Sequence, residues 1–161
     1  VTNAGGAVTS TPAMLGVIPP VERRWVPAII LQSQPYATIN LETTSTFAPT
    51  SNWAAFGSLL LTKKSQWYFD LSAPLPQQRF YRAWQTNALS RASTLDLHMV
   101  PAISLSGSIG SSVRLDYINQ FGSTDAWITL ATVLLTENPQ LYFDTSAIGQ
   151  PPRLWRIVPV P

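Results

Sequence analysis

Alternation of apolar and polar residues runs along most of this chain, and no stretch shows the 3.6-residue period of an amphipathic helix. In residues 38–44, for example, Ile39 and Leu41 fall on one face of an extended strand, while Asn40 and Glu42 fall on the other. Applied to the whole chain, the pattern predicts strands at 25–32, 38–44, 53–62, 66–71 and 78–86, and again at 94–100, 101–106, 111–118, 126–136, 139–145 and 152–159. Short strands separated by turn residues predict an all-β protein of antiparallel sheets packed as sandwiches.

The pattern repeats with a period of 74 residues. The run Gln66-Trp-Tyr-Phe-Asp70 returns as Gln140-Leu-Tyr-Phe-Asp144, and Arg79-Phe-Tyr-Arg82 returns as Arg153-Leu-Trp-Arg156. The alignment holds without a gap over the whole of 26–82, and roughly a third of its positions are identical. A period of this length indicates one folding unit used twice.

The repeat divides the chain into four predicted segments, which are an extended leader (1–20), a first β-sandwich repeat (21–86), a linker (87–93) and a second β-sandwich repeat (94–161). The leader carries no charge, and its three prolines exclude a helix. Units of about 75 residues have marginal cores of their own. We therefore expect the two repeats to pack on each other or on a partner.

Several runs of the second repeat resemble a fibronectin type III-like repeat of bacterial proteins, namely Leu105-Ser-Gly-Ser-Ile-Gly110, Val113-Arg-Leu-Asp116, Trp127-Ile-Thr-Leu-Ala-Thr132, Tyr142-Phe-Asp144 and Arg153-Leu-Trp-Arg156. The first repeat is similar in its closing Arg79-Phe-Tyr-Arg82, but Ser33-Gln-Pro-Tyr36 stands where the glycine hairpin is usual. In the second repeat, Leu154-Trp155 replaces the usual Phe-Tyr. The resemblance implies spacer, adhesive or assembly modules of secreted and surface proteins, and it implies no catalytic residues.

Composition limits the partners. The chain is 45% apolar and 11% charged, which suits a well-buried β protein. Ten basic residues stand against eight acidic ones, and the only basic clusters are Arg23-Arg24 and Lys63-Lys64, so we expect no nucleic-acid binding. The absence of cysteine excludes disulfides and thiolate metal ligands. No apolar run reaches the roughly 18 residues that span a bilayer, so we expect no membrane span.

The first residue, Val1, is not followed by the basic start and apolar run of a signal peptide. We expect a secreted or cell-surface bacterial protein whose signal has been removed; the alternative is a piece of a longer protein.

Few residues could carry catalysis. His98 is the single histidine, and only Asp96 is near enough in sequence to orient it, so we interpret it as an ordinary strand residue. Paired carboxylates could indicate a glycosidase, and an aspartate in a loop could bind calcium, but one acid per loop supplies too few ligands. We predict no enzymatic activity, no metal and no cofactor.

The acids and arginines that recur with the repeat are better explained as structural. Asp70 and Asp144 follow a Tyr-Phe pair and precede a serine two residues on, which is typical of an Asx turn at a strand end. The two arginines of each closing motif have opposite parity, so they point to opposite faces of their sheet. We therefore expect the arginines to pair with the acids of neighbouring strands, the residues concerned being Glu42, Asp70, Arg79, Arg82, Asp116, Asp144, Arg153 and Arg156.

Six tryptophans are the feature most suggestive of binding. Trp53 and Trp127 occupy equivalent positions, which predicts core packing, as does the pairing of Tyr81 with Trp155. Trp25, Trp67 and Trp84 have no aromatic counterpart, and Ile30 is replaced by a serine in the second repeat. We expect these four to lie in an interface, where tryptophan is enriched. A row of exposed rings that stacks on sugars is the alternative.

The sequence thus favours a non-enzymatic extracellular structural or assembly protein, a surface or filament building block that contacts other copies of itself or another extracellular protein. A carbohydrate-binding module for a polysaccharide is the alternative. Residues 1–82 hold six basic against three acidic residues, a net +3, whereas residues 83–161 hold four against five, a net −1. This asymmetry predicts a head-to-tail contact between copies. The leader could add a strand to a neighbour's sheet edge. The sequence identifies neither the partner nor the oligomeric state.

Overall fold

The computed structural model describes residues 2–3, 6–7, 21–48, 52–86, 94–120 and 126–160. Within them the protein is all-β with antiparallel strands, as predicted, and η1 (Thr145–Ala147) is a single 3-10 turn. The strands are β1 (Thr2–Asn3), β2 (Gly6–Ala7), β3 (Arg23–Gln32), β4 (Thr38–Thr44), β5 (Ala54–Leu60), β6 (Ser65–Phe69), β7 (Phe80–Gln85), β8 (Thr94–Leu105), β9 (Ser112–Ile118), β10 (Ile128–Leu134), β11 (Gln140–Phe143) and β12 (Leu154–Pro159). Apart from the β1–β2 pair, the predicted leader lies outside the described residues, as does the predicted linker.

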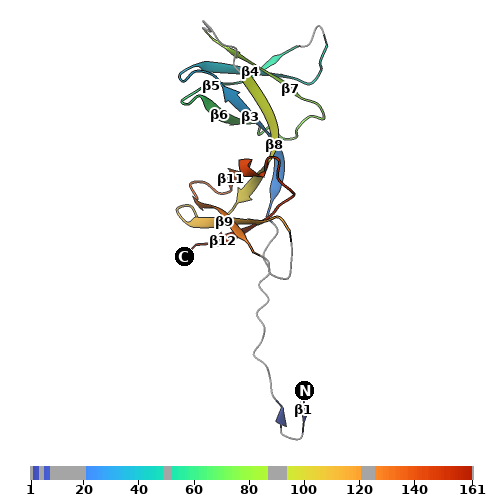
Figure 1. Ribbon diagram of the computed structural model, residues 1–161, viewed down its shortest axis with the longest axis vertical. Coiled ribbons are helices and arrows are strands. Elements are labelled where there is room, and N and C mark those ends of the chain that lie inside the picture. Colours follow the sequence, from blue (N-terminus) through green and yellow to red (C-terminus); the bar gives the residue numbers. More distant parts are fainter. Residues whose placement is uncertain are drawn as a thin grey trace.

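A four-stranded sheet in the order β11-β8-β3-β6 runs through the middle of the molecule (Figure 1). Strands β3 and β8 pair over ten residues, from Arg23 opposite Ile103 to Gln32 opposite Thr94. Val26 faces Val100, a residue 74 positions later, so positions one sequence period apart are equivalent in this ladder. The two halves of the chain therefore share one sheet.

Strand β8 is continuous, and the predicted break between 100 and 101 was wrong. The backbone N–H of Ser104 donates to Glu22 O, so Glu22 and Ser104 form a hydrogen-bonded pair. Hydrogen-bonded and non-hydrogen-bonded pairs alternate along an antiparallel ladder. Trp25 and Pro101, three residues further along, are therefore a non-hydrogen-bonded pair. Pro101 therefore sits where β3 requires no N–H from it, and its carbonyl accepts from Asp144 N.

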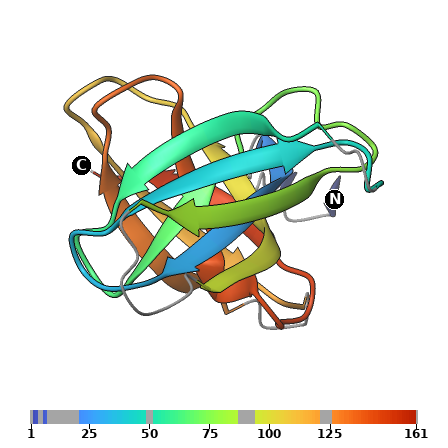
Figure 2. The ribbon, with the colours of Figure 1, turned by 90° about the horizontal axis from the view of Figure 1, so that it is seen from above.

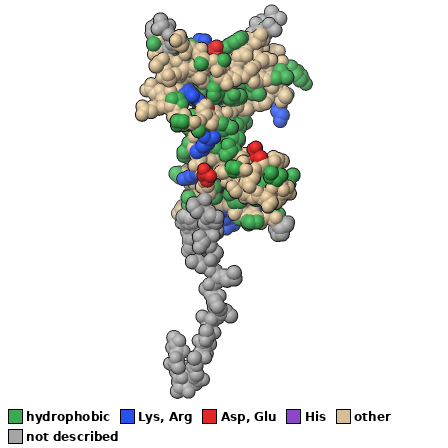
Figure 3. All heavy atoms as spheres, turned by 180° about the vertical axis from the view of Figure 1, so that it is seen from behind, with side chains coloured by type: hydrophobic (Ala, Val, Ile, Leu, Met, Phe, Trp, Pro, Cys, Tyr) green, Lys and Arg blue, Asp and Glu red, His purple; other side chains and the backbone are tan. Residues whose placement is uncertain are grey.

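Two three-stranded sheets, β5-β4-β7 and β10-β9-β12, pack on the same face of this central sheet, one near each end. Figure 2 looks onto the first of them. One core gathers Ile29 and Leu31 of β3 with residues of β4, and another gathers Ile103 and Leu105 of β8 with residues of β9. From behind, the molecule narrows between its two ends, and apolar side chains gather there (Figure 3).

The opposite face of the central sheet is covered by aromatic rings. Val26, Ala28, Val100 and Ala102 form a buried strip of small side chains at its centre. Because these side chains are short, Phe69 of β6 and Phe143 of β11 lean across them and stack with their ring centroids 3.9 Å apart, although two strands separate them.

Candidate functional site

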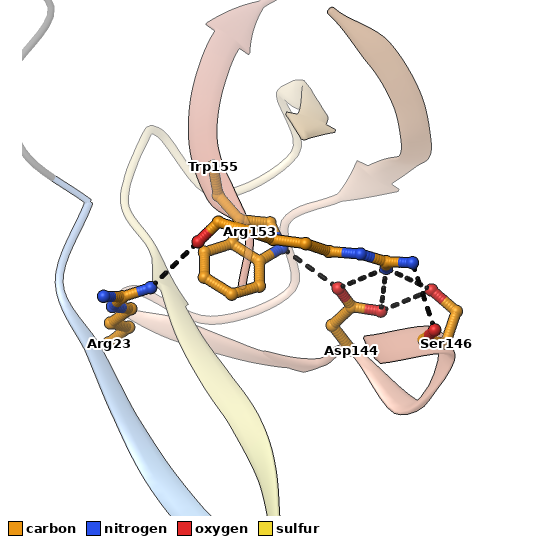
Figure 4. A network of polar contacts seen from close by, with 5 residues as sticks. All are labelled: Arg23, Asp144, Ser146, Arg153 and Trp155. Carbon is orange, nitrogen blue, oxygen red and sulfur yellow. Dashed lines mark hydrogen bonds and ion pairs between the residues drawn. The ribbon is translucent and has the colours of Figure 1, made fainter. Parts of the chain in front are cut away.

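A buried polar cluster surrounds Asp144, immediately after β11 (Figure 4). Arg153 Nη1 lies 3.0 Å from Asp144 Oδ2, and Trp155 Nε1 donates to the same oxygen at 3.0 Å. Ser146 Oγ donates to Asp144 Oδ1 at 2.6 Å, and the Arg153 guanidinium lies over the Tyr117 ring at 4.1 Å from its centroid. Both carboxylate oxygens of Asp144 are therefore held by donors of the protein.

Asp70 has the equivalent surroundings after β6. Arg79 and the Tyr81 hydroxyl both donate to its Oδ2, the hydroxyl at 2.6 Å, and Ser72 N donates to its Oδ1 at 2.9 Å. Burial acts to raise the pKa of Asp70, but hydrogen bonds from Ser72, Tyr81 and Arg79 outweigh it and hold this pKa below its ordinary value. Burial, together with the bond to Asp70, raises the pKa of the Tyr81 hydroxyl.

Two further acids, Glu42 and Asp116, pair with arginines on the outer faces of the three-stranded sheets. Arg82 Nε donates to Glu42, and its guanidinium stacks over Trp53 at 4.5 Å. Trp53 therefore lies against an arginine on the outer face and is not part of the core described above; the expectation of core packing was wrong.

Trp127 has the same position in the second half, over Arg156 at 4.5 Å, and its expected core packing was also wrong. Arg156 and Arg114 both bind the buried Asp116. Burial acts to raise the pKa of Asp116, but hydrogen bonds from Arg114, Arg156 and Thr129 lower it overall.

His98 Nε2 lies 2.9 Å from Asp96 Oδ2 on β8, and its ring meets the edge of Trp67. Among the described residues, no three His, Asp or Glu side chains cluster in a way that could hold a metal ion. The described part also contains no helix long and apolar enough to cross a bilayer. The polar clusters of the described residues thus consist of carboxylates bound by arginine and of one exposed His–Asp pair.

The unmatched tryptophans lie on three different surfaces. Trp67 faces the aromatic side of the central sheet, where its strand partner is Ile30. Trp84 is exposed on the outer face of β7, opposite Asn40. Trp25 lies on the other side of the central sheet and is 53% exposed. The structure brings Ile30 and Trp67 together but forms no single row of tryptophans.

Trp25 lines a cleft of about 400 Å³ beside the segment that leads into β12. Trp155 and Arg23 form part of its wall, and the Arg23 guanidinium lies over the Trp155 ring at 5.1 Å. The exposed amide side chains of Gln150 and Asn119 also line it. The cleft thus combines an apolar ring with hydrogen-bonding groups.

The two ends of the central sheet carry exposed apolar residues close to charged ones. The first tip consists of the turn at 33–37 and the adjacent turn at 61–64, joined by hydrogen bonds from Tyr36 N to Leu61 O and from Ser33 N to Lys64 O. It exposes Tyr36 and Leu60 beside Lys63 and Lys64.

The second tip consists of the turns at 106–111 and 135–139, joined by a hydrogen bond from Gly110 N to Leu135 O. It exposes Ile109 and Leu134 beside Glu137. Neither Glu137 nor the two lysines of the first tip form an ion pair with the described residues. The signal available in the sequence was Tyr36, which stands where the other half has Gly110.

No family model, curated protein or solved structure matches this chain.

Proposed function

We propose that this chain is a non-enzymatic extracellular building block of bacterial surfaces or filaments, made of two fibronectin type III-like sandwiches fused through a shared sheet, and that copies join head to tail. The tandem arrangement is supported by the cores, where equivalent residues one period apart are buried, such as Leu31 with Leu105 and Leu41 with Leu115. A structural role is supported by the buried carboxylates in the described part of the chain, each of which is bound by arginine.

The observation that carries the proposal is the opposite charge of the two tips. The turn with Lys64 lies at the end of β3, because the next residue, Ser65, pairs with Gln32. The turn with Glu137 lies at the end of β8, because Gln140 pairs with Leu105. The β3–β8 ladder separates these ends by on the order of 35 Å, from the ordinary rise of a strand. Unlike charges at opposite ends favour a heterologous contact, which forms open filaments when its rotation does not close a ring.

The shared sheet suits a block that transmits force. Tandem modules joined by a flexible linker bend at the linker, whereas here ten ladder pairs connect the two halves. We therefore expect both halves to unfold in one cooperative transition.

Light scattering over a range of protein concentrations tests the assembly. At low salt the native mass should rise with concentration, and Lys64→Glu should weaken association by about five- to ten-fold, since an exposed ion pair contributes up to about 1 kcal/mol. Arg24→Glu changes the net charge equally at the middle of the molecule and serves as the control. Adding Glu137→Lys to Lys64→Glu should restore association. A constant monomer mass, or equal loss in both single variants, would contradict the proposal.

A saccharide-binding function is the second candidate, and the Trp25 cleft is the observation that favours it. Sugar rings stack their C–H faces on exposed aromatic rings, and amide and guanidinium groups bind hydroxyls. Met99 is the residue one period after Trp25 and is also exposed, so it offers a matched control. In a pull-down on insoluble polysaccharides, Trp25→Ala should abolish retention while Met99→Ala keeps it. Equal retention of both variants would exclude the cleft as the binding site.

A further inference from the structure

Tyr36 stands in a backbone conformation that costs free energy. Its φ is 66°, in the left-handed region, and the equivalent residue of the second tip, Gly110, has a φ of 88°. Glycine adopts this region freely, whereas a side chain with a Cβ does so at a cost. The sequence therefore keeps a large aromatic residue where the turn itself favours glycine.

The Tyr36 side chain gains little from its own fold. It is 81% exposed, more than any other large apolar residue described, and it takes part in none of the described aromatic contacts. Strained residues cluster at functional sites, and an observed outlier is a reason to seek a function. An exposed, strained tyrosine in a turn at the end of the sheet is well suited to anchor a contact, because tyrosine is enriched among the residues that dominate interfaces.

The second tip holds a cavity for such an anchor. A cleft of about 660 Å³ opens between the 106–111 turn and the end of β12. Its apolar wall contains Val113, Ile157 and Val160, and serines line much of the remainder. Glu22, which is exposed, adds a negative charge at this cleft, in the same sense as Glu137 of the neighbouring turn.

The charges match across the contact. The first tip presents Lys63 and Lys64 on the turn adjacent to that of Tyr36, and the second presents Glu22 in the cleft wall and Glu137 on the neighbouring turn. An apolar anchor surrounded by complementary charge is the arrangement of an interface with a buried centre and a polar rim.

We propose that Tyr36 of one copy inserts into the second-tip cleft of the next copy, with Lys63 and Lys64 facing Glu22 and Glu137 of that tip. This inference rests on the head-to-tail function proposed above and names the residue and the cleft that join the copies. The turn leaves the ring exposed at this end of the sheet, and association compensates for the strain. Free subunits carry the strain without that compensation.

Removal of the ring separates assembly from folding. Tyr36→Gly should weaken association at least ten-fold by light scattering, while the midpoint of thermal unfolding stays unchanged or rises by up to about 2–4 °C, because the strain is relieved. Tyr36→Phe keeps the ring and should retain association. Ser106→Trp tests the partner tip of the same contact. Ser106 is exposed and lines the cleft, so a tryptophan there should fill the cleft and block association as well.

Mixing distinguishes a shared contact from two independent defects. Tyr36→Gly retains an intact second tip, and Ser106→Trp retains an intact first tip, so an equimolar mixture should form dimers that grow no further. If Tyr36→Gly assembles like the unaltered chain while Lys64→Glu does not, the tips associate without this anchor and the inference is wrong although the proposed function stands. If deletion of residues 1–18 abolishes assembly while Tyr36→Gly leaves it intact, the leader and not Tyr36 joins the copies, and the inference is likewise wrong.

Discussion

Replacement of Asp144 by asparagine should be among the most damaging single changes in this protein. The substitution preserves the shape of the side chain but removes the charge that neutralises Arg153. Asp144 is fully buried, and the Arg153 side chain is only 6% exposed. The arginine therefore cannot turn to solvent without leaving the core beside Trp155 and Tyr117.

The structure sets the size of the effect. Removing one partner of a buried ion pair leaves an uncompensated charge and costs about 3–5 kcal/mol. The turn hydrogen bond that the sequence predicts at this position accounts for only about 1 kcal/mol of that loss. Asp70 provides the matched comparison, because its partner Arg79 is 22% exposed and can regain water. We expect Asp70→Asn to cost roughly 1–3 kcal/mol.

Urea unfolding followed by tryptophan fluorescence measures both values. The double variant Asp144→Asn/Arg153→Met should recover part of the loss, since it removes the unpaired charge and keeps most of the volume. If Asp144→Asn proves no more destabilising than Asp70→Asn, or if the double variant is worse than the single one, burial of Arg153 does not determine the cost.

Three other outcomes are expected. The pKa values of Asp70 and Asp116 in the folded protein lie below the ordinary value of about 4. The two carboxylates therefore contribute fully to the free energy of unfolding above that pH, and this contribution is lost as the pH falls through the lowered pKa values. Urea unfolding at a series of acidic pH values that showed no loss of stability would contradict this. His98→Ala should change the unfolding free energy by less than about 0.5 kcal/mol, and no hydrolytic activity should depend on His98 or Asp70; a reproducible activity lost in either variant would show that the polar clusters are catalytic. Deletion of residues 1–18 should reduce particle size in light scattering if the leader strengthens the contact between copies, and equal assembly of the truncated chain would refute that role.

Strand positions could be read from the sequence because alternation and turn residues act locally. The ends of β4 and β9 match the predicted ranges to within a residue, since in each strand buried apolar residues alternate with polar ones. The pairing of β3 with β8 could not be read, because alternation shows which side chains share a face and not which strand lies alongside. The false break at Pro101 has the same origin, since proline interrupts a strand only where its N–H is needed.

The site was predictable in part for similar reasons. The acid–arginine pairs follow from the repeat and from strand parity, and the structure places Asp70 with Arg79 and Asp144 with Arg153. Equivalence between the repeats does not show whether a residue is buried, however. A tryptophan recurs at the position of Trp53 because it stacks on an arginine at the surface. The sequence alone does not single out Tyr36, because an exposed aromatic residue has significance only once the φ of its turn is known.

The head-to-tail contact is tested most directly by disulfide trapping, which is simple here because the chain has no cysteine. Lys64→Cys and Glu137→Cys are prepared as separate single variants, mixed under mild oxidation and separated on a non-reducing gel. Contact between unlike tips predicts a cross-linked dimer that needs both variants, and a ladder of covalent multimers when both cysteines are in one chain. Dimers that form as readily from Lys64→Cys alone, or no cross-link in the mixture, would contradict head-to-tail assembly.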